Sequence, residues 1–171
     1  MQFSKWALII LSIVGCCLLV LVGWYLYLRV SCIGVNIERT VAIIKPDAVS
    51  AKCTGKIIDR IEQEGFTIVE LKKITLSKEL AEQFYEMHKE LMFYRELIDF
   101  MVSGPCIVMV LERENAIKVW RDLIGSTDPK EAKDGTLRKQ FGTNISKNAV
   151  HGSDSDRAAK REMGLLFGVK G

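Results

Sequence analysis

Residues 106–111 read CIVMVL, a continuous apolar run that is typical of a central, buried β-strand. Ser103-Gly104-Pro105 directly precede this run and break the helical pattern that comes before it. Residues 40–44, TVAII, form a second run rich in β-branched residues, and Lys45-Pro46 stop it. We therefore expect both runs to be buried strands of one sheet.

The remaining patterns place helices and further strands around these two runs. Helical spacing or a helix-start signal marks residues 55–64, 77–102, 114–125 and 155–167, and strand patterns mark 66–75 and 149–151. Residues 126–142 are polar and long for a loop. Without the extra helices, the element order becomes β-α-β followed by β-α-β. This order predicts an α+β fold of the ferredoxin-like, split βαβ type, a four-stranded antiparallel sheet covered by helices on one face.

Residues 7–28, ALIILSIVGCCLLVLVGWYLYL, carry no charge. As a helix this segment would measure about 33 Å, enough to cross a bilayer core of ~30 Å. Trp6 lies at one end and Trp24 near the other, which suits the two membrane interfaces. We therefore expect a single transmembrane helix before the domain: residues 1–30 as anchor, 31–38 as linker and 39–171 as catalytic domain.

Two other interpretations of the first segment stay open. A cleaved secretory signal has a shorter apolar core, of ~7–15 residues. The sequence Ile13-Val14-Gly15-Cys16 is similar to a lipoprotein cleavage site, but residues 17–28 that would follow are still strongly apolar. Positive charge is more frequent after the segment than before it, which favours a cytoplasmic position for the domain.

Charge and cysteine usage exclude several classes of function. Residues 31–171 hold 22 basic and 21 acidic side chains, so the domain offers no general basic excess for nucleic-acid binding. The five cysteines form no C-x-x-C pair, so they indicate neither a zinc site nor a disulfide framework. We expect a domain from a reducing compartment, with no metal-ligating residues.

His151 is the main candidate for a catalytic residue in this sequence. It lies in residues 148–155, NAVHGSDS, where a strand ends and a helix begins, and helix N-termini favour anions. A neutral imidazole, whose usual pKa is about 6.5, can attack a phosphoryl group. The alternative is a polar turn residue or helix cap. His88, the second histidine, is expected on the surface of a helix.

Four further polar side chains could take part in such a site. Glu162 shares an apolar stripe with Ala158 and Leu166, so it is either a buried base that orients His151 or a solvated residue at the stripe's edge. Lys45 follows a strand directly and could bind phosphate or be solvated. Arg121 and Arg138 flank the long loop and could bind a triphosphate or be ordinary surface charges. No Walker A or G-x-G-x-x-G pattern is present, so a glycine loop is not expected to bind phosphate.

Taken together, residues 38–167 resemble nucleoside diphosphate kinases. The resemblance rests on the strand that ends in Ile44-Lys45-Pro46-Asp47, on Ser103-Gly104-Pro105, and on residues 148–155, which match the family's active-site signature. It implies that His151 accepts a phosphoryl group from a nucleoside triphosphate and passes it to a diphosphate, with ping-pong kinetics.

The resemblance also implies a role for each residue of the site. Lys45 would bind phosphate, and Arg121, Thr127, Arg138 and Asn148 would hold the phosphates and the ribose. Phe93 would stack on the base, with Leu97 and Ile145 in apolar contact, while Tyr85, Ser153 and Glu162 would position the imidazole. Mg²⁺ would be bound mainly through the nucleotide phosphates. The family forms homo-oligomers, either tetramers or hexamers.

At one position the sequence differs from the family's usual pattern, and this difference leaves other functions as alternatives. The family usually has Arg-Pro before the aromatic residue that stacks on the base, whereas this chain has Leu91-Met92. The loss of one cationic contact predicts weaker nucleotide binding. A catalytically weak or inactive nucleotide-binding scaffold at a membrane is therefore an alternative, and a kinase that passes phosphate from histidine to a partner protein is a third hypothesis.

Overall fold

The two apolar runs form the central strands of the sheet. The computed structural model describes Trp24 and residues 37–168, and in it β1 (Ile37–Ile44) and β3 (Cys106–Glu114) pair antiparallel, from Ile37 opposite Glu114 to Ile44 opposite Ile107. β2 (Thr67–Ile74) pairs with β3, and β4 (Val150–Gly152) pairs with β1, both antiparallel. The resulting order β2-β3-β1-β4 confirms the predicted ferredoxin-like antiparallel sheet.

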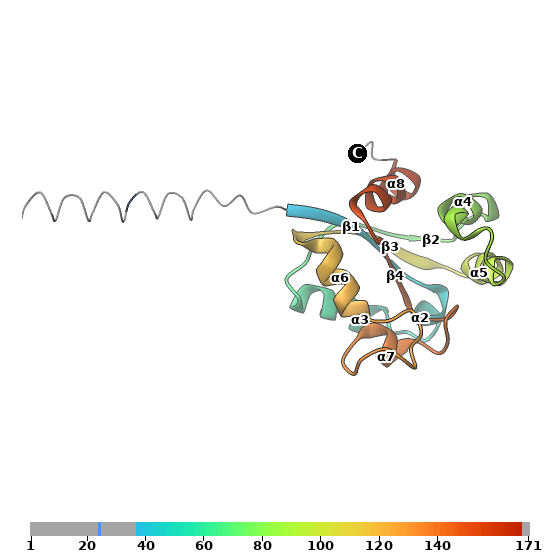
Figure 1. The fold of residues 1–171 in the computed structure, drawn as a ribbon, viewed down its shortest axis with the longest axis horizontal. Helices are drawn as coiled ribbons and strands as arrows, with labels where there is room; N and C mark the ends of the chain where they lie inside the picture. The colour runs from blue at the N-terminus through green and yellow to red at the C-terminus, as the bar shows by residue number, and fades with distance from the viewer. Residues whose placement is uncertain (1–23, 25–36, 169–171) are drawn as a thin grey trace, which may run out of the picture. The chain divides into compact units, whose positions relative to one another are not determined.

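The helices of the described region are short and connect or flank these strands (Figure 1). They are α2 (Pro46–Ser50), α3 (Thr54–Gln63), α4 (Lys78–Phe84), the 3₁₀ turn η1 (Glu86–His88), α5 (Tyr94–Met101), α6 (Ala116–Ile124), α7 (Leu137–Phe141) and α8 (Asp156–Phe167). The expected helical stretch 77–102 is therefore two helices with a 3₁₀ turn between them. Helices α2 and α7 were not predicted, because each has five residues and shows too little helical periodicity in the sequence.

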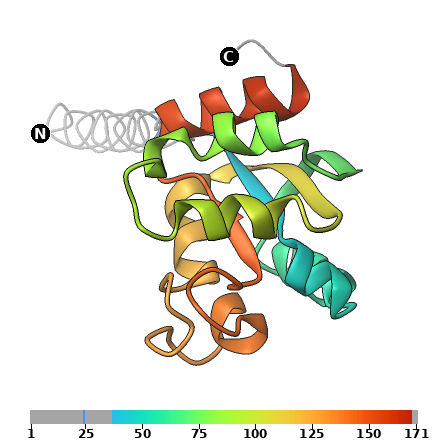
Figure 2. The same ribbon diagram turned by 90° about the vertical axis from the view of Figure 1, so that its right-hand side faces the viewer.

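Helices cover both faces of the sheet, so the prediction of one covered face was wrong. Ala42 and Ile44 pack in one core with α3 and α6, whereas Val41 and Ile43 pack in a second core with α4, α5 and α8 (Figure 1). In Figure 2, α4 and α8 run side by side on this second face. The physical reason is that the unbroken apolar runs of β1 and β3 point large side chains in both directions, and each set needs its own cover.

The sheet brings the end of β1 beside β4. His151 lies opposite Ile43, and the backbone N–H of Lys45 donates to the carbonyl of Ala149 at 2.8 Å. Directly after β4 the chain enters α8, whose N-cap Ser155 accepts from the backbone N–H of Ala158 at 3.2 Å. The strand end, the nucleophile candidate and the start of a helix are therefore close together.

Two predictions concern the start of the chain. Ile37 and Glu38 were expected at the end of a linker but belong to β1, because they pair with Glu114 and Arg113 of β3. The predicted membrane segment, residues 7–28, lies outside the described residues except for Trp24. Within the described residues, no helix is long and apolar enough to cross a membrane.

Candidate active site

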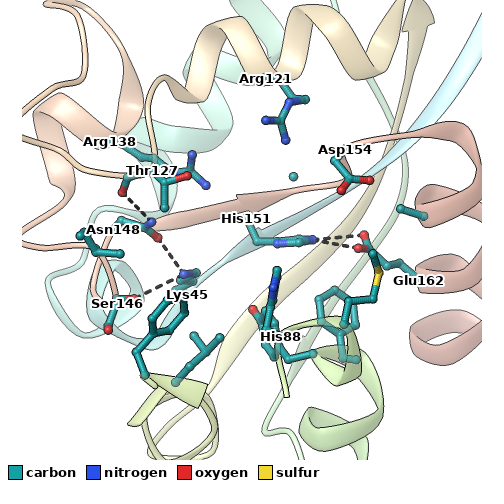
Figure 3. A pocket seen from close by; sticks show the side chains of 18 residues that line it. Lys45, His88, Arg121, Thr127, Arg138, Ser146, Asn148, His151, Asp154 and Glu162 are labelled. Atoms are coloured by element: carbon teal, nitrogen blue, oxygen red, sulfur yellow. Dashed lines mark hydrogen bonds and ion pairs between the residues drawn. The ribbon is translucent and has the colours of Figure 1, made fainter. Parts of the chain in front are cut away.

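A pocket of about 230 Å³ opens where β1 and β4 end (Figure 3). Its walls come from Lys45 directly after β1, the α4–η1 segment, α5, α6, α7, the loops on either side of α7, β4, and α8 with the residues just before it. All predicted site residues except Ser153 line it: Lys45, Tyr85, Phe93, Leu97, Arg121, Thr127, Arg138, Ile145, Asn148, His151 and Glu162. Residues more than a hundred positions apart in sequence are thus gathered around one space.

The imidazole of His151 is held by a buried carboxylate. Its Nε2 atom lies 3.2 Å from each carboxylate oxygen of Glu162, and the Oγ of Ser153 donates to Glu162 Oε2 at 2.7 Å. The Glu162 residue is only 6% exposed. Of the two interpretations of Glu162, the buried partner of His151 is therefore the one that the structure shows. Ser153 does not line the pocket but contacts the carboxylate from within the protein.

Two aromatic rings flank the imidazole edge-on. The ring centroid of His151 lies 5.1 Å from that of Phe84 and 6.1 Å from that of Tyr85. The hydroxyl of Tyr85 is buried and has no hydrogen-bond partner within the described part of the chain. Burial, together with the charge of Glu162, raises the pKa of Tyr85 far above its usual value. The phenol therefore stays protonated.

Lys45 is a buried cation at the end of β1. Its Nζ donates to Asn148 Oδ1 at 2.7 Å and to the carbonyl of Ser146 at 3.4 Å. Burial, and next the charge of Arg138, lower the pKa of Lys45 to about 7, although Asp47 acts in the opposite direction. Neither oxygen that contacts the ammonium is charged, so an anionic ligand would be a better partner for it.

Two guanidinium groups add to this positive charge. Arg138 donates to the carbonyls of Gly125 at 2.8 Å and Val150 at 3.2 Å. Burial and the neighbouring charge of Arg121 lower the pKa of Arg138 to about 10, so it stays charged at neutral pH. Arg121 comes from α6 and points toward the space above His151 (Figure 3). The lining carboxylates are Glu162 and Asp154, and Glu162 already contacts His151. The pocket is thus suited to a polyphosphate.

The other end of the pocket is apolar. Leu97 is buried, whereas Phe93 and Ile145 are 39% and 49% exposed and leave their surfaces free for a flat ligand. Thr127 contributes its carbonyl to the network, because Asn148 Nδ2 donates to it at 3.0 Å. Leu91 and Met92, by contrast, do not line the pocket, and Met92 is fully exposed.

Part of the pocket lining was not predicted from the sequence. The pocket-lining residues that were not predicted are Phe84, Met87, His88, Ser146, Gly152, Asp154 and Ala158. His88 is exposed as expected, but it also lines the pocket, because η1 turns it back toward Tyr85 with ring centroids 6.2 Å apart. Gly152 and Asp154 lie in the quoted stretch 148–155 and could have been found there. Ser146 acts through its backbone carbonyl, for which the sequence carries no signal.

Comparisons with known proteins show the family of the chain. The family model described as "Nucleoside diphosphate kinase" matches residues 38–170. The nucleoside diphosphate kinase of a Nitratiruptor species is 56% identical over 130 residues, which are 76% of this chain and 95% of the relative. That of Persephonella marina is 52% identical over 132 residues, 77% of this chain and 94% of the relative.

Solved structures give the same result. The nucleoside diphosphate kinase of Aquifex aeolicus superposes with a TM-score of 0.76 at 47% identity, covering 77% of this chain and 96% of that one. The enzyme of Halobacterium salinarum, solved in complex with CDP, has a TM-score of 0.75 at 36% identity and covers 77% and 88%. The chain therefore belongs to the nucleoside diphosphate kinase family, a family of phosphotransferases.

Proposed function

We propose that this nucleoside diphosphate kinase transfers the γ-phosphoryl group through Nδ1 of His151. The supporting observation is that Glu162 contacts Nε2 through both carboxylate oxygens. A ring that donates its Nε2 proton to a carboxylate has its lone pair on Nδ1. The nitrogen left unengaged by Glu162 is then the nucleophile.

The transfer would occur in two half-reactions. Nδ1 attacks the γ-phosphorus, a nitrogen–phosphorus bond forms, the bond from phosphorus to the β-phosphate oxygen breaks, and the nucleoside diphosphate leaves. A second diphosphate then attacks the phosphohistidine with a terminal oxygen, which restores the neutral imidazole. The ring becomes cationic when phosphorylated, and the adjacent Glu162 carboxylate stabilises that charge.

The remaining site residues would bind the nucleotide. Lys45, Arg121 and Arg138 neutralise the phosphates, and Asn148 and Thr127 orient the ribose and phosphates next to Lys45. Phe93 stacks on the base, with Leu97 and Ile145 in apolar contact. Stacking reads no base edge, so the site would accept different bases. Tyr85 and Ser153 position the imidazole and its carboxylate partner.

Mg²⁺ would enter with the nucleotide. The ion is expected to be held mainly by the phosphate oxygens. Asp154 is the exposed lining carboxylate and would be its protein contact. When bound, the ion neutralises charge on the phosphates.

The phosphoenzyme assay tests this proposal. Incubation with γ-labelled ATP should give an acid-labile, base-stable phosphoprotein. The label should be absent in His151→Asn and present in His88→Asn, a matched control because these are the two histidines of the chain. Stable label in His151→Asn would overturn the assignment.

The scaffold alternative rests on Leu91-Met92. It predicts nucleotide binding by the parent chain, with turnover no faster than in His151→Asn. A kinase that acts on a partner protein would instead keep its label on His151 in the presence of GDP. Rapid loss of label to GDP, with formation of GTP, would exclude both.

We further propose a membrane location, on the basis of the uncharged residues 7–28. The segment would anchor the chain as a single-pass helix, with the catalytic domain on the cytoplasmic side and residues 31–36 as connection. Leu18→Arg places a charge at its centre, where it is strongly unfavourable in lipid. The full chain and Leu18→Ala should stay with alkali-washed membranes, and Leu18→Arg should be released. Equal release of all three would contradict the anchor.

A further inference from the structure

Helix α6 places an indole ring against the backbone of the nucleophile. Trp120 is completely buried, and its Nε1 donates to the carbonyl of His151 at 3.1 Å. This residue does not line the pocket. Its neighbour Arg121 points into the pocket from the same helix (Figure 3). Two adjacent residues of α6 therefore contact different parts of the site: Arg121 lines the pocket, and Trp120 contacts the strand that carries His151.

The packing of the indole on β4 is unusually close. A Cβ atom added to Gly152 would lie 2.4 Å from both Cδ1 and Nε1 of Trp120, so only glycine leaves room for the ring here. On its other side the ring meets Phe66 edge-on, with centroids 6.1 Å apart. The indole is held in place by this packing, and its hydrogen bond has a defined direction.

The strand that it contacts is short and lies at one edge of the sheet. β4 has three residues and pairs with a single neighbour, β1, at the end of the sheet. Two side chains add donors to its carbonyls: Arg138 to Val150 and Trp120 to His151. Of these two, the indole is the one that bonds to the carbonyl of His151 itself, and it lies outside the pocket lining.

We propose that Trp120 is a positioning residue for phosphoryl transfer. Its N–H holds the backbone carbonyl of His151 in place. The direction of the Cα–Cβ bond, and with it the position of the imidazole relative to the γ-phosphorus, is then fixed. Glu162 fixes the rotation of the imidazole ring, and Trp120 fixes the position of the backbone to which the ring is attached. In-line attack depends on both, because small displacements of a nucleophile slow the reaction strongly. The inference rests on the proposed role of His151 and names a residue that acts through it.

An isosteric replacement separates the hydrogen bond from the packing. In the full chain, Trp120 alone is exchanged for β-(3-benzothienyl)alanine, which has sulfur in place of the indole N–H and nearly the same shape. Loss of one neutral hydrogen bond predicts single-turnover phosphorylation by ATP that is about threefold to tenfold slower. The Kd for ADP should change less than twofold, because no ligand contact is lost.

Ile61→Val is the control, because Ile61 is a completely buried residue of α3 that does not line the pocket. The loss of one methyl group should lower the melting temperature, while the phosphorylation rate and the ¹⁵N imidazole resonances of His151 stay as in the parent. In the benzothienyl protein these resonances should shift. Equal phosphorylation rates and unshifted resonances in that protein would overturn the role of Trp120. If the parent itself carries no label on His151, the proposed function fails instead, so the two failures are distinguishable.

Discussion

At the scale of single residues, Lys45 connects nucleotide binding to pH. Burial lowers its pKa from 10.5 to about 7 in the free protein, so the ammonium loses its proton above neutrality. A bound polyphosphate favours the charged form, so binding takes up a proton there. Nucleotide affinity should therefore fall as pH rises above 7.

The same shift means that the unfolded chain binds more protons between pH 7 and 10.5, so stability rises with pH across that window.

Calorimetry checks this linkage. Titration of ADP at pH 8 in buffers of different ionisation enthalpy should show proton uptake by the parent that is clearly greater than in Lys45→Met, which keeps most of the side-chain length but not the charge. Identical proton uptake in both proteins would show that a group other than Lys45 takes up the proton.

Glu162 is predicted to act on the chemical step. Glu162→Ala removes the partner of Nε2, so the ring loses its fixed tautomer and the stabilisation of its charged form. Hydrogen bonds to charged groups contribute about 1.5–3 kcal/mol, which corresponds to phosphorylation about 10- to 100-fold slower. The Kd for nucleotide should change little. Asp156→Asn, which alters an exposed carboxylate on the same helix, is the control and should keep the parent rate. Parent-like kinetics in Glu162→Ala would remove this residue from the site.

By the resemblance described above, Leu91 takes the place of an arginine in the family's pattern. Leu91→Arg should lower the KM for nucleotides about twofold to fivefold, a small gain because the position is 43% exposed and screened by water. Leu91→Gln tests polarity without charge and should have no such effect. Steady-state kinetics on both variants decide whether a cation at this position reaches the phosphates.

At the scale of elements, the junction of β4 and α8 determines the site. A three-residue strand carries His151, and the following helix returns Glu162 to its ring. The start of α8 is defined by Ser155, whose Oγ accepts from the N–H of Ala158 at 3.2 Å. Any loosening of this first turn would displace the strand and the helix together.

Ser155→Ala should lower the free energy of unfolding by about 1 kcal/mol. Ser77→Ala is a matched control, because Ser77 caps α4 with the same bond at 3.2 Å. Urea denaturation should show similar losses for both, whereas phosphorylation should slow more in Ser155→Ala, since α8 carries Glu162. Equal phosphorylation rates would mean that the cap stabilises α8 without positioning Glu162.

At the scale of the whole molecule, the sheet ends in an open edge. β2 lies last in the order of the described strands, and its Val69 and Leu71 are 38% and 45% exposed. An edge with exposed apolar side chains favours pairing with another chain. We therefore expect β2 to be buried where this chain associates with a second copy of itself.

Sedimentation velocity tests this expectation. Leu71→Lys should shift the protein to smaller species, whereas Met92→Lys, an equally apolar-to-charged change at a fully exposed residue elsewhere, should not. Unchanged sedimentation of Leu71→Lys would place the interface on another surface.

The sequence by itself determined the central strands, the order of the main elements and the stretch that holds His151. These features depend on local patterns: two unbroken apolar runs, N-cap serines at 77 and 155, and a polar motif between a strand and a helix. The resemblance further predicted the site residues, and the fold gathers them around one pocket, except for Ser153 behind it. Their roles remain predictions for the experiments above.

Only the tertiary structure decided how these segments meet. It covers the sheet on both faces, buries Glu162 against His151, and turns His88 into the pocket. It also brings the uncharged oxygens of Ser146 and Asn148 to the ammonium of Lys45, and Trp120 to the carbonyl of His151. The physical reason is that periodicity reports how a segment is buried but not which distant segment buries it. Burial, pKa shifts and hydrogen bonds between residues far apart in sequence therefore arise only when the chain is folded.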